Sequence, residues 1–188
     1  MKTKVCGVGI NDSARPTSRL VEGVLFHHPA YVAWHNMINR CYSGRYPSYK
    51  GVTVCEEWKY FTAFYGWWKK NHVKDYALDK DLKVPGNKIY GPDTCLYIPG
   101  WMNTYISARK GAYAKGVTYD KRLRRYKAQR PTADKRGRYI GYFDTVELAH
   151  EAWLKDLDKG ITPDINGLDI SLREIFLKWK ANQNQEDI

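Results

Sequence analysis

The stretch GVTYDKRLRRYKAQRPTADKRGRYIGYFDTVELAHEAWLKDLD, residues 116–158, determines how the second half of this chain folds. Three short runs rich in tyrosine and β-branched residues, at 116–119, 125–129 and 139–143, are separated by polar and charged turns. Such runs predict strands that are joined by hairpin turns. We therefore expect a three-stranded antiparallel sheet with basic side chains on its strands.

A helix is expected directly after the third run. Thr145 is a good N-cap residue, and Glu147 lies in the first turn, where the helix dipole favours a negative charge. Apolar side chains then recur every three or four residues and predict one apolar face: Leu148, Ala149, Ala152, Trp153 and Leu157. That face is expected to cover one side of the sheet and to leave the other side open.

Positive charge is concentrated in the same region. Between residues 109 and 138 the chain carries twelve lysines and arginines against two aspartates, a local balance of +10 in a chain whose total is +11. A basic run that is merely solvated is the simpler alternative. Four tyrosines interleave with the cations, however, and the run lies on predicted strands, which favours a phosphate-binding surface: Tyr119, Tyr126, Tyr139 and Tyr142.

Several spaced residues resemble the plant APETALA-type (ethylene-responsive-factor) DNA-binding domain: Gly116-Val117-x-Tyr119, Tyr126-Lys127-Ala128, Gly141-Tyr142-Phe143-Asp144-Thr145, and then Glu147, Ala149 and Ala152. That family inserts a three-stranded sheet into the major groove. The resemblance implies that Tyr142, Phe143, Ala149 and Ala152 form the core between sheet and helix. The implied DNA contacts, with their neighbouring cations, are Lys115, Lys121, Arg122, Arg124, Arg125, Lys127, Gln129 and Arg138. Which of them read base edges and which hold phosphates stays open.

The first half of the chain predicts a separate helical unit. Residues 31–41 predict a helix with an apolar face, residues 52–55 a short strand, and residues 56–70 a strongly aromatic helix. A tryptophan stripe at helical spacing is more typical of a core than of a ligand cage.

The segment LDKDLKVPGNKIYGPDTCLYIPGWMN, residues 78–103, has the outline of a ββα hairpin. A strand end carries acidic residues, two turns contain proline, a second strand spans residues 95–97, and a helix starts near Gly100. This outline resembles the phage HNH-type (ββα-metal) homing endonucleases. The resemblance implies that Asp79 and Asn103 hold a divalent cation, and their oxygen ligands would suit Mg²⁺.

The chain departs from that family at two positions. Lys80 stands where the family has the histidine that activates water, and Thr94 where it has the asparagine that steadies the hairpin. A lysine at its ordinary pKa is charged at neutral pH and is a poor general base, although it can stabilise a phosphate. The expected catalytic set is Asp79, Lys80 and Asp81, with Asp81, Tyr90 or His72 as substitutes for the histidine. Exposed turn carboxylates without a metal remain the alternative.

Four cysteines, Cys6, Cys41, Cys55 and Cys95, contain no C-x-x-C pair and so lack zinc-ribbon spacing. We interpret them as buried thiols. A scattered metal site, joined by His27, His28 or His35, is the alternative.

Together these features predict an α+β protein with three parts: an HNH-like ββα unit with aromatic helices at 1–107, an APETALA-like domain at 108–160, and a C-terminal helix and tail at 161–188. In the last part, residues 164–167 predict a turn. Residues 170–180 predict an amphipathic helix that packs on its own domain or supports a homodimer or a protein partner. No apolar run is long enough for a membrane span, and the N-terminus lacks a signal peptide, so we expect no membrane partner and a cytoplasmic location, in the host cell if the protein is phage-encoded.

The working hypothesis is sequence-directed binding of double-stranded DNA, coupled to metal-dependent nicking or cleavage as in the phage homing endonucleases. Two rival interpretations stay open. The first is a non-catalytic DNA-binding regulator with a degenerate HNH frame, which the missing histidine favours. In the second, the basic surface binds RNA or a nucleoprotein, and the tyrosines stack on single-stranded bases.

Overall fold

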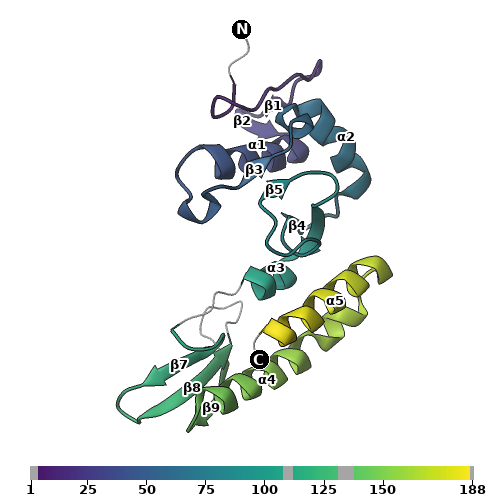
Figure 1. Cartoon of the computed structure of the whole chain (residues 1–188). Coiled ribbons are helices and arrows are strands. Elements are labelled where there is room, and N and C mark those ends of the chain that lie inside the picture. Colours follow the sequence, from purple (N-terminus) through teal and green to yellow (C-terminus); the bar gives the residue numbers. More distant parts are fainter. Residues whose placement is uncertain (1–3, 108–111, 131–137, 187–188) are drawn as a thin grey trace. The chain divides into compact units, whose positions relative to one another are not determined.

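The computed structural model describes residues 4–107, 112–130 and 138–186 (Figure 1). Within these ranges the chain has five α-helices and four small sheets, which confirms the α+β class. It divides into two compact units. The first comprises Met1–Ile106 and Lys178–Ile188, and the second comprises Ser107–Leu177.

Two helices form the core of the first unit. α1 (Pro29–Tyr42) begins after His28, whose Nδ1 accepts a hydrogen bond from the backbone N–H of Ala30 at 3.1 Å. α2 (Phe61–Asn71) follows a short 3₁₀ turn, η2 (Glu57–Lys59). The apolar faces of both helices meet in an aromatic core, where the Trp34 indole donates to the Trp58 carbonyl at 2.7 Å. The tryptophans at helical spacing therefore serve the core, as predicted.

Three two-stranded sheets complete the first unit. β1 (Ser18–Val21) and β2 (Val24–His27) form an antiparallel hairpin that the sequence did not predict. β3 (Thr53–Val54) pairs in parallel with β5 (Ile89–Tyr90), next to the 3₁₀ turn η1 (Pro47–Tyr49). β4 (Tyr76–Asp79) pairs antiparallel with β6 (Leu96–Pro99), and α3 (Gly100–Ser107) follows β6 directly. The predicted strand–strand–helix order of residues 78–103 is thus present.

The second unit is a three-stranded antiparallel sheet with a helix on one face. β7 (Val117–Asp120), β8 (Arg125–Arg130) and β9 (Arg138–Phe143) lie in chain order, and α4 (Val146–Asn166) runs along the sheet (Figure 1). Val117 and Ala128 pair across two strands and are buried, as are Ala149, Trp153 and Leu157 of α4. The sequence predicted this sheet and its covering helix.

The start of α4 is as predicted, but its length and its apolar face are not. The Thr145 hydroxyl oxygen accepts the Leu148 N–H at 3.3 Å, which confirms the N-cap. Leu148 itself is 50% exposed, so its predicted place in the core was wrong. The helix also continues to Asn166, through most of the predicted turn at 164–167.

The final helix, α5 (Ile170–Glu186), extends beyond the predicted 170–180. Phe176 and Trp179 are buried within the chain, and the Trp179 ring lies 5.9 Å from that of Tyr105. The apolar face therefore packs on its own protein. None of the helices in the described part of the chain is long and apolar enough to cross a bilayer.

Candidate nucleic-acid interface

One face of the β7–β8–β9 sheet carries the helix, and the other face points away from it. Because successive side chains alternate between the two faces of a strand, the buried residues fix the direction of their neighbours. Val117 and Ala128 point toward α4, so Thr118 and Lys127, which also pair, point outward. The same alternation puts Arg125 and Gln129 on the outward face. Three of the predicted DNA contacts, Arg125, Lys127 and Gln129, thus share one face.

The turn between β7 and β8 holds three more of the predicted contacts: Lys121, Arg122 and Arg124, all exposed. Asp120 organises this turn. Its Oδ1 accepts the backbone N–H groups of Arg122 at 2.9 Å and Leu123 at 3.1 Å, and its Oδ2 accepts the Tyr142 hydroxyl at 3.0 Å. Together these bonds hold the pKa of the Asp120 carboxyl below its usual range, and the bond from the Leu123 N–H contributes most. Arg124 closes the turn with a left-handed φ of 54°.

Arg125 is held by an acidic partner from the neighbouring strand end. Its Nε lies 2.9 Å and its Nη2 2.8 Å from Oδ1 of Asp144, which follows β9. Both side chains are substantially exposed, at 46% and 75%. The pair therefore lies at the surface, on the outward side of the sheet.

A β-bulge explains why Arg138 does not join this face. The register shifts between Ala128 and Gln129, so Ile140 is an extra residue on β9. The bulge turns Tyr139 outward and Arg138 toward the helix side. There Arg138 Nε lies 2.9 Å from Oδ1 of Asp156 on α4, while Arg130 Nε makes an ion pair at 3.1 Å with Oδ2, outside hydrogen-bond geometry. The expectation that Arg138 lies among the groove contacts is corrected by this placement.

The tyrosines divide between the two faces. Tyr119 and Tyr126 pair on the inward side, with Tyr113 packed against both at ring distances of 6.2 and 5.3 Å. Tyr142 pairs with Lys127 on the outward face, and its ring lies 5.6 Å from that of Tyr139. The predicted core position of Tyr142 was therefore wrong. Phe143 takes the inward position, and Ala149 is buried as expected, with Ala152 half-buried.

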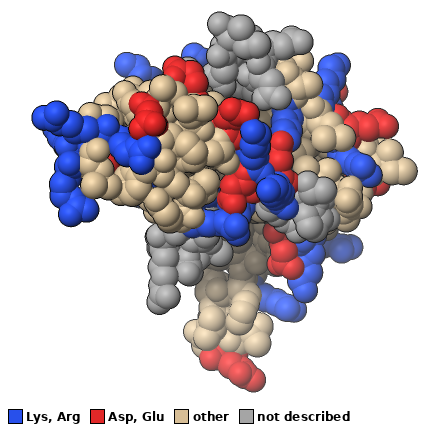
Figure 2. All heavy atoms as spheres, turned by 90° about the horizontal axis from the view of Figure 1, so that it is seen from below, with Lys and Arg blue, Asp and Glu red and all other residues tan. Residues whose placement is uncertain are grey.

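The basic run also extends beyond the three strands of the sheet. Lys115 precedes β7, and its carbonyl oxygen accepts a hydrogen bond from His150 Nδ1 at 2.9 Å. In Figure 2, lysine and arginine atoms gather at the left edge of the view, where Figure 1 places the β7–β8 turn. Other cations of the basic run lie outside the described residues: Arg109, Lys110, Lys135 and Arg136.

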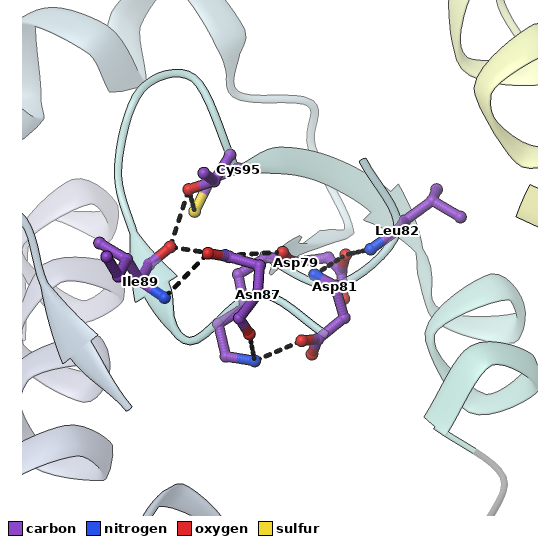
Figure 3. Close-up of polar contacts among 8 residues, drawn as sticks. Asp79, Asp81, Leu82, Asn87, Ile89 and Cys95 are labelled. Atoms are coloured by element: carbon purple, nitrogen blue, oxygen red, sulfur yellow. Dashed lines mark hydrogen bonds and ion pairs between the residues drawn. The ribbon is translucent and has the colours of Figure 1, made fainter. Parts of the chain in front are cut away.

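The ββα segment of the first unit brings Asp79, Lys80 and Asp81 together at the end of β4 (Figure 3). Asp79 is only 5% exposed, and its Oδ2 accepts the backbone N–H groups of Asp81 at 2.9 Å and Leu82 at 2.8 Å. Burial raises the pKa of this carboxyl, and the two backbone bonds oppose the shift. The carboxylate thus caps the loop that follows its own strand.

Lys80 is also engaged within this loop. Its ammonium contacts the Asp81 carboxylate and donates to the Asn87 carbonyl at 3.2 Å. The Asn87 amide donates to the carbonyls of Lys80 at 3.1 Å and Ile89 at 2.7 Å, so it fastens the two sides of the loop (Figure 3). The Thr94 hydroxyl donates to Ile89 O at 2.8 Å. Asn87 and Thr94 therefore steady the hairpin, the role that the resemblance gave to an asparagine at position 94.

This donor set fits a divalent cation poorly. Mg²⁺ requires near-octahedral oxygen ligands and keeps several waters, whereas one Asp79 oxygen already accepts two backbone bonds and Lys80 neutralises Asp81. Asn103 lies half-buried on α3, the helix that follows β6. In the described ranges, no group of three His, Cys, Asp or Glu side chains is placed to hold a metal ion.

The cysteines follow the thiol interpretation except at one position. Cys95 is buried and Cys41 and Cys55 are half-buried, and burial raises the pKa of all three thiols, that of Cys41 to about 11. Cys6 is exposed, so its predicted burial was wrong.

The fold and its outward face define a small α+β protein with a basic, open three-stranded sheet. No family model matches this chain, and the searches of curated proteins and of solved structures found no significant match either. Sequence reasoning gave no role to three acids that position these cations. Asp120 organises the β7–β8 turn, Asp144 holds Arg125 on the outward face, and Asp156 holds Arg138 on the helix side.

Proposed function

We propose that this protein binds double-stranded DNA through the outward face of the β7–β8–β9 sheet. One observation carries the proposal. Among the described residues of the second unit no helix covers the outward face, and five basic side chains from β8 and the β7–β8 turn stand on or beside it: Lys121, Arg122, Arg124, Arg125 and Lys127. The major groove admits a two-stranded β-ribbon such as β7 and β8, which carry these cations with their turn, and clustered cations on one face suit phosphates.

The distribution of aromatic rings favours duplex DNA over single strands. Binding of single strands relies on aromatic platforms on which bases stack. Tyr119 and Tyr126 point inward against Tyr113. Two of the four tyrosines lie on the outward face: Tyr139, which is 57% exposed, and Tyr142, whose hydroxyl donates to Asp120. The outward face therefore offers cations and hydrogen-bonding groups in a larger number than stacking surfaces.

A competition experiment tests the proposal. Labelled duplex bound to the full chain is challenged with unlabelled duplex or single strands of the same sequence at fixed salt. We expect duplex to compete better. Lys127→Ala is expected to weaken binding and to lower the magnitude of the salt slope by about 1. Lys159→Ala, an exposed lysine on α4, is the matched control and should change neither quantity. Preferred competition by single strands would contradict the proposal.

Strand cleavage by the ββα unit is the second candidate function. The order β4, β6 and α3, with Asp79 at the strand end, favours it. The loop bonds of Asp79 and Lys80 and the absence of a histidine at position 80 oppose it. Supercoiled plasmid incubated with the protein and Mg²⁺ or Mn²⁺ separates the two roles. If the plasmid stays supercoiled while the protein is bound to it, only the DNA-binding role remains. Nicking that Asp79→Asn abolishes would establish cleavage.

A further inference from the structure

The most specific arrangement on the outward face is the pair formed by Arg125 and Asp144. Asp144 holds the Nε–Nη2 edge of the guanidinium through a single oxygen, at 2.9 and 2.8 Å. The two residues come from adjacent strand ends, because Tyr126 pairs with Phe143 one position further in. Arg125 is therefore fixed in direction by a second strand.

An exposed ion pair contributes little to stability, so a stabilising role accounts poorly for this one. Its geometry has another consequence. An arginine that is gripped on its Nε–Nη2 edge presents its Nη1–Nη2 end as a fork, and two parallel N–H donors match O6 and N7 of guanine in the major groove. Lys127, the neighbouring outward cation, is a point charge with no such directionality.

We propose that Arg125, oriented by Asp144, reads a guanine in the major groove and so determines sequence preference at one base pair. The inference rests on the proposed binding of duplex DNA. Arg125 is the contacting residue, and Asp144 is a positioning residue that touches no base. Lys121, Arg122 and Lys127 supply affinity that is independent of sequence.

Removal of the Asp144 carboxylate separates the effect of Arg125 orientation from the effect of net charge, because the two effects change duplex binding in opposite directions. Loss of a negative charge from a DNA-binding face strengthens binding to every duplex. Loss of the grip on Arg125 weakens binding only where guanine occupies the position that is read. A variant that merely damaged the fold would lower both the affinity for every duplex and the preference for guanine.

The test is selection from a library of randomised duplexes with four proteins: wild type, Asp144→Ala, Arg125→Lys and Glu151→Gln. Glu151 is an exposed acid on α4, so its variant controls for charge alone. Wild type is expected to enrich guanine at one position. In direct titrations, Asp144→Ala, which has no acceptor for Arg125, and Arg125→Lys should each lose about 5- to 100-fold of the preference for guanine there. Their affinity for mixed-sequence duplex should be kept or increased, and Glu151→Gln should retain the preference.

The outcomes distinguish this inference from the function on which it rests. Failure of wild type to bind any duplex would remove both. Binding without a preferred base, or an unchanged guanine preference in Asp144→Ala, would overturn the inference and leave the proposed function standing.

Discussion

Gly116 lies where two requirements for glycine coincide. Its φ is +75°, and a Cβ at this position would lie 2.1 Å from indole atoms of Trp153. A side chain here would strain the backbone at positive φ, and it would also require Trp153 or α4 to move away from the sheet. We therefore regard the contact between Gly116 and Trp153 as a close fit between the two layers of the second unit.

Gly116→Ala is expected to lower the free energy of unfolding by at least about 2 kcal/mol, because backbone strain and overpacking add. Urea unfolding followed by circular dichroism measures the change. Gly44→Ala is the matched control, since its φ is +73° with no atom within 4 Å of an added Cβ, and it should cost only about 1 kcal/mol. Equal losses in the two variants would show that the Trp153 ring moves away from the added Cβ at little cost in free energy.

Asp79 gives a second prediction at this scale. Asp79→Ala leaves the N–H groups of Asp81 and Leu82 without their acceptor and should destabilise the protein by about 1–3 kcal/mol. Asp79→Asn keeps a carbonyl oxygen in place and should lose much less. Unfolding of both variants in urea at neutral pH compares them. Equal destabilisation would rule out the capping role.

The raised pKa of Asp79 also predicts a dependence on pH. The folded protein keeps the proton at pH values where the unfolded chain has lost it, so stability falls as pH rises from the ordinary value of 3.8 through the raised folded value. Asp79→Asn lacks this contribution. The unfolding free energy of wild type relative to Asp79→Asn should therefore decrease with rising pH across that window. A difference that increases with pH would mean that the two backbone bonds outweigh the desolvation.

At the scale of elements, the β7–β8 hairpin depends on Asp120. Its carboxylate ties the turn to β9 through Tyr142, although it places a negative charge on a face that is proposed to bind a polyanion. We interpret Asp120 as the residue that holds the cations of the β7–β8 turn, Lys121, Arg122 and Arg124, in position.

Asp120→Ala should weaken duplex binding by about 5-fold, which corresponds to about 1 kcal/mol of lost hydrogen bonding, despite the gain in net positive charge. Tyr142→Phe removes only the bond across to β9 and should lose less. Asp120→Asn keeps the turn acceptor and removes the charge, so it should bind at least as well as wild type. Fluorescence anisotropy titrations at one salt concentration measure all three. Tighter binding by Asp120→Ala would mean that charge alone governs the tip.

The sequence predicted the elements better than the directions of individual side chains. The three strand runs and the Thr145 cap depend on local chemistry and were found where expected, whereas the lengths of α4 and α5 were underestimated. Arg138 was misplaced because one bulged residue reverses the faces beyond it, and Tyr142 because two adjacent aromatics give no sign of which one faces the helix. The β1–β2 hairpin was missed, since its apolar residues are exposed, Leu20 at 70%. The capping of the loop by Asp79 depends on a backbone path that the pattern of acids does not encode.

At the scale of the whole molecule, net charge is not sufficient for the proposed function. The chain carries +11, and its pI is 9.4, yet two cations of the basic run face Asp156 and others lie outside the described residues. The proposed function requires that the five cations of the outward face act together on one duplex. It therefore predicts the size of the salt dependence of binding, because each phosphate that is neutralised releases counterions.

The salt dependence of duplex binding tests this claim most directly. With about five phosphates neutralised, the slope of log affinity against log salt concentration should be about −4 to −5 for wild type. Replacement of Lys121, Arg122 and Arg124 together by alanine should reduce its magnitude by about 3. A wild-type slope near zero, or an unchanged slope in the triple variant, would contradict the account.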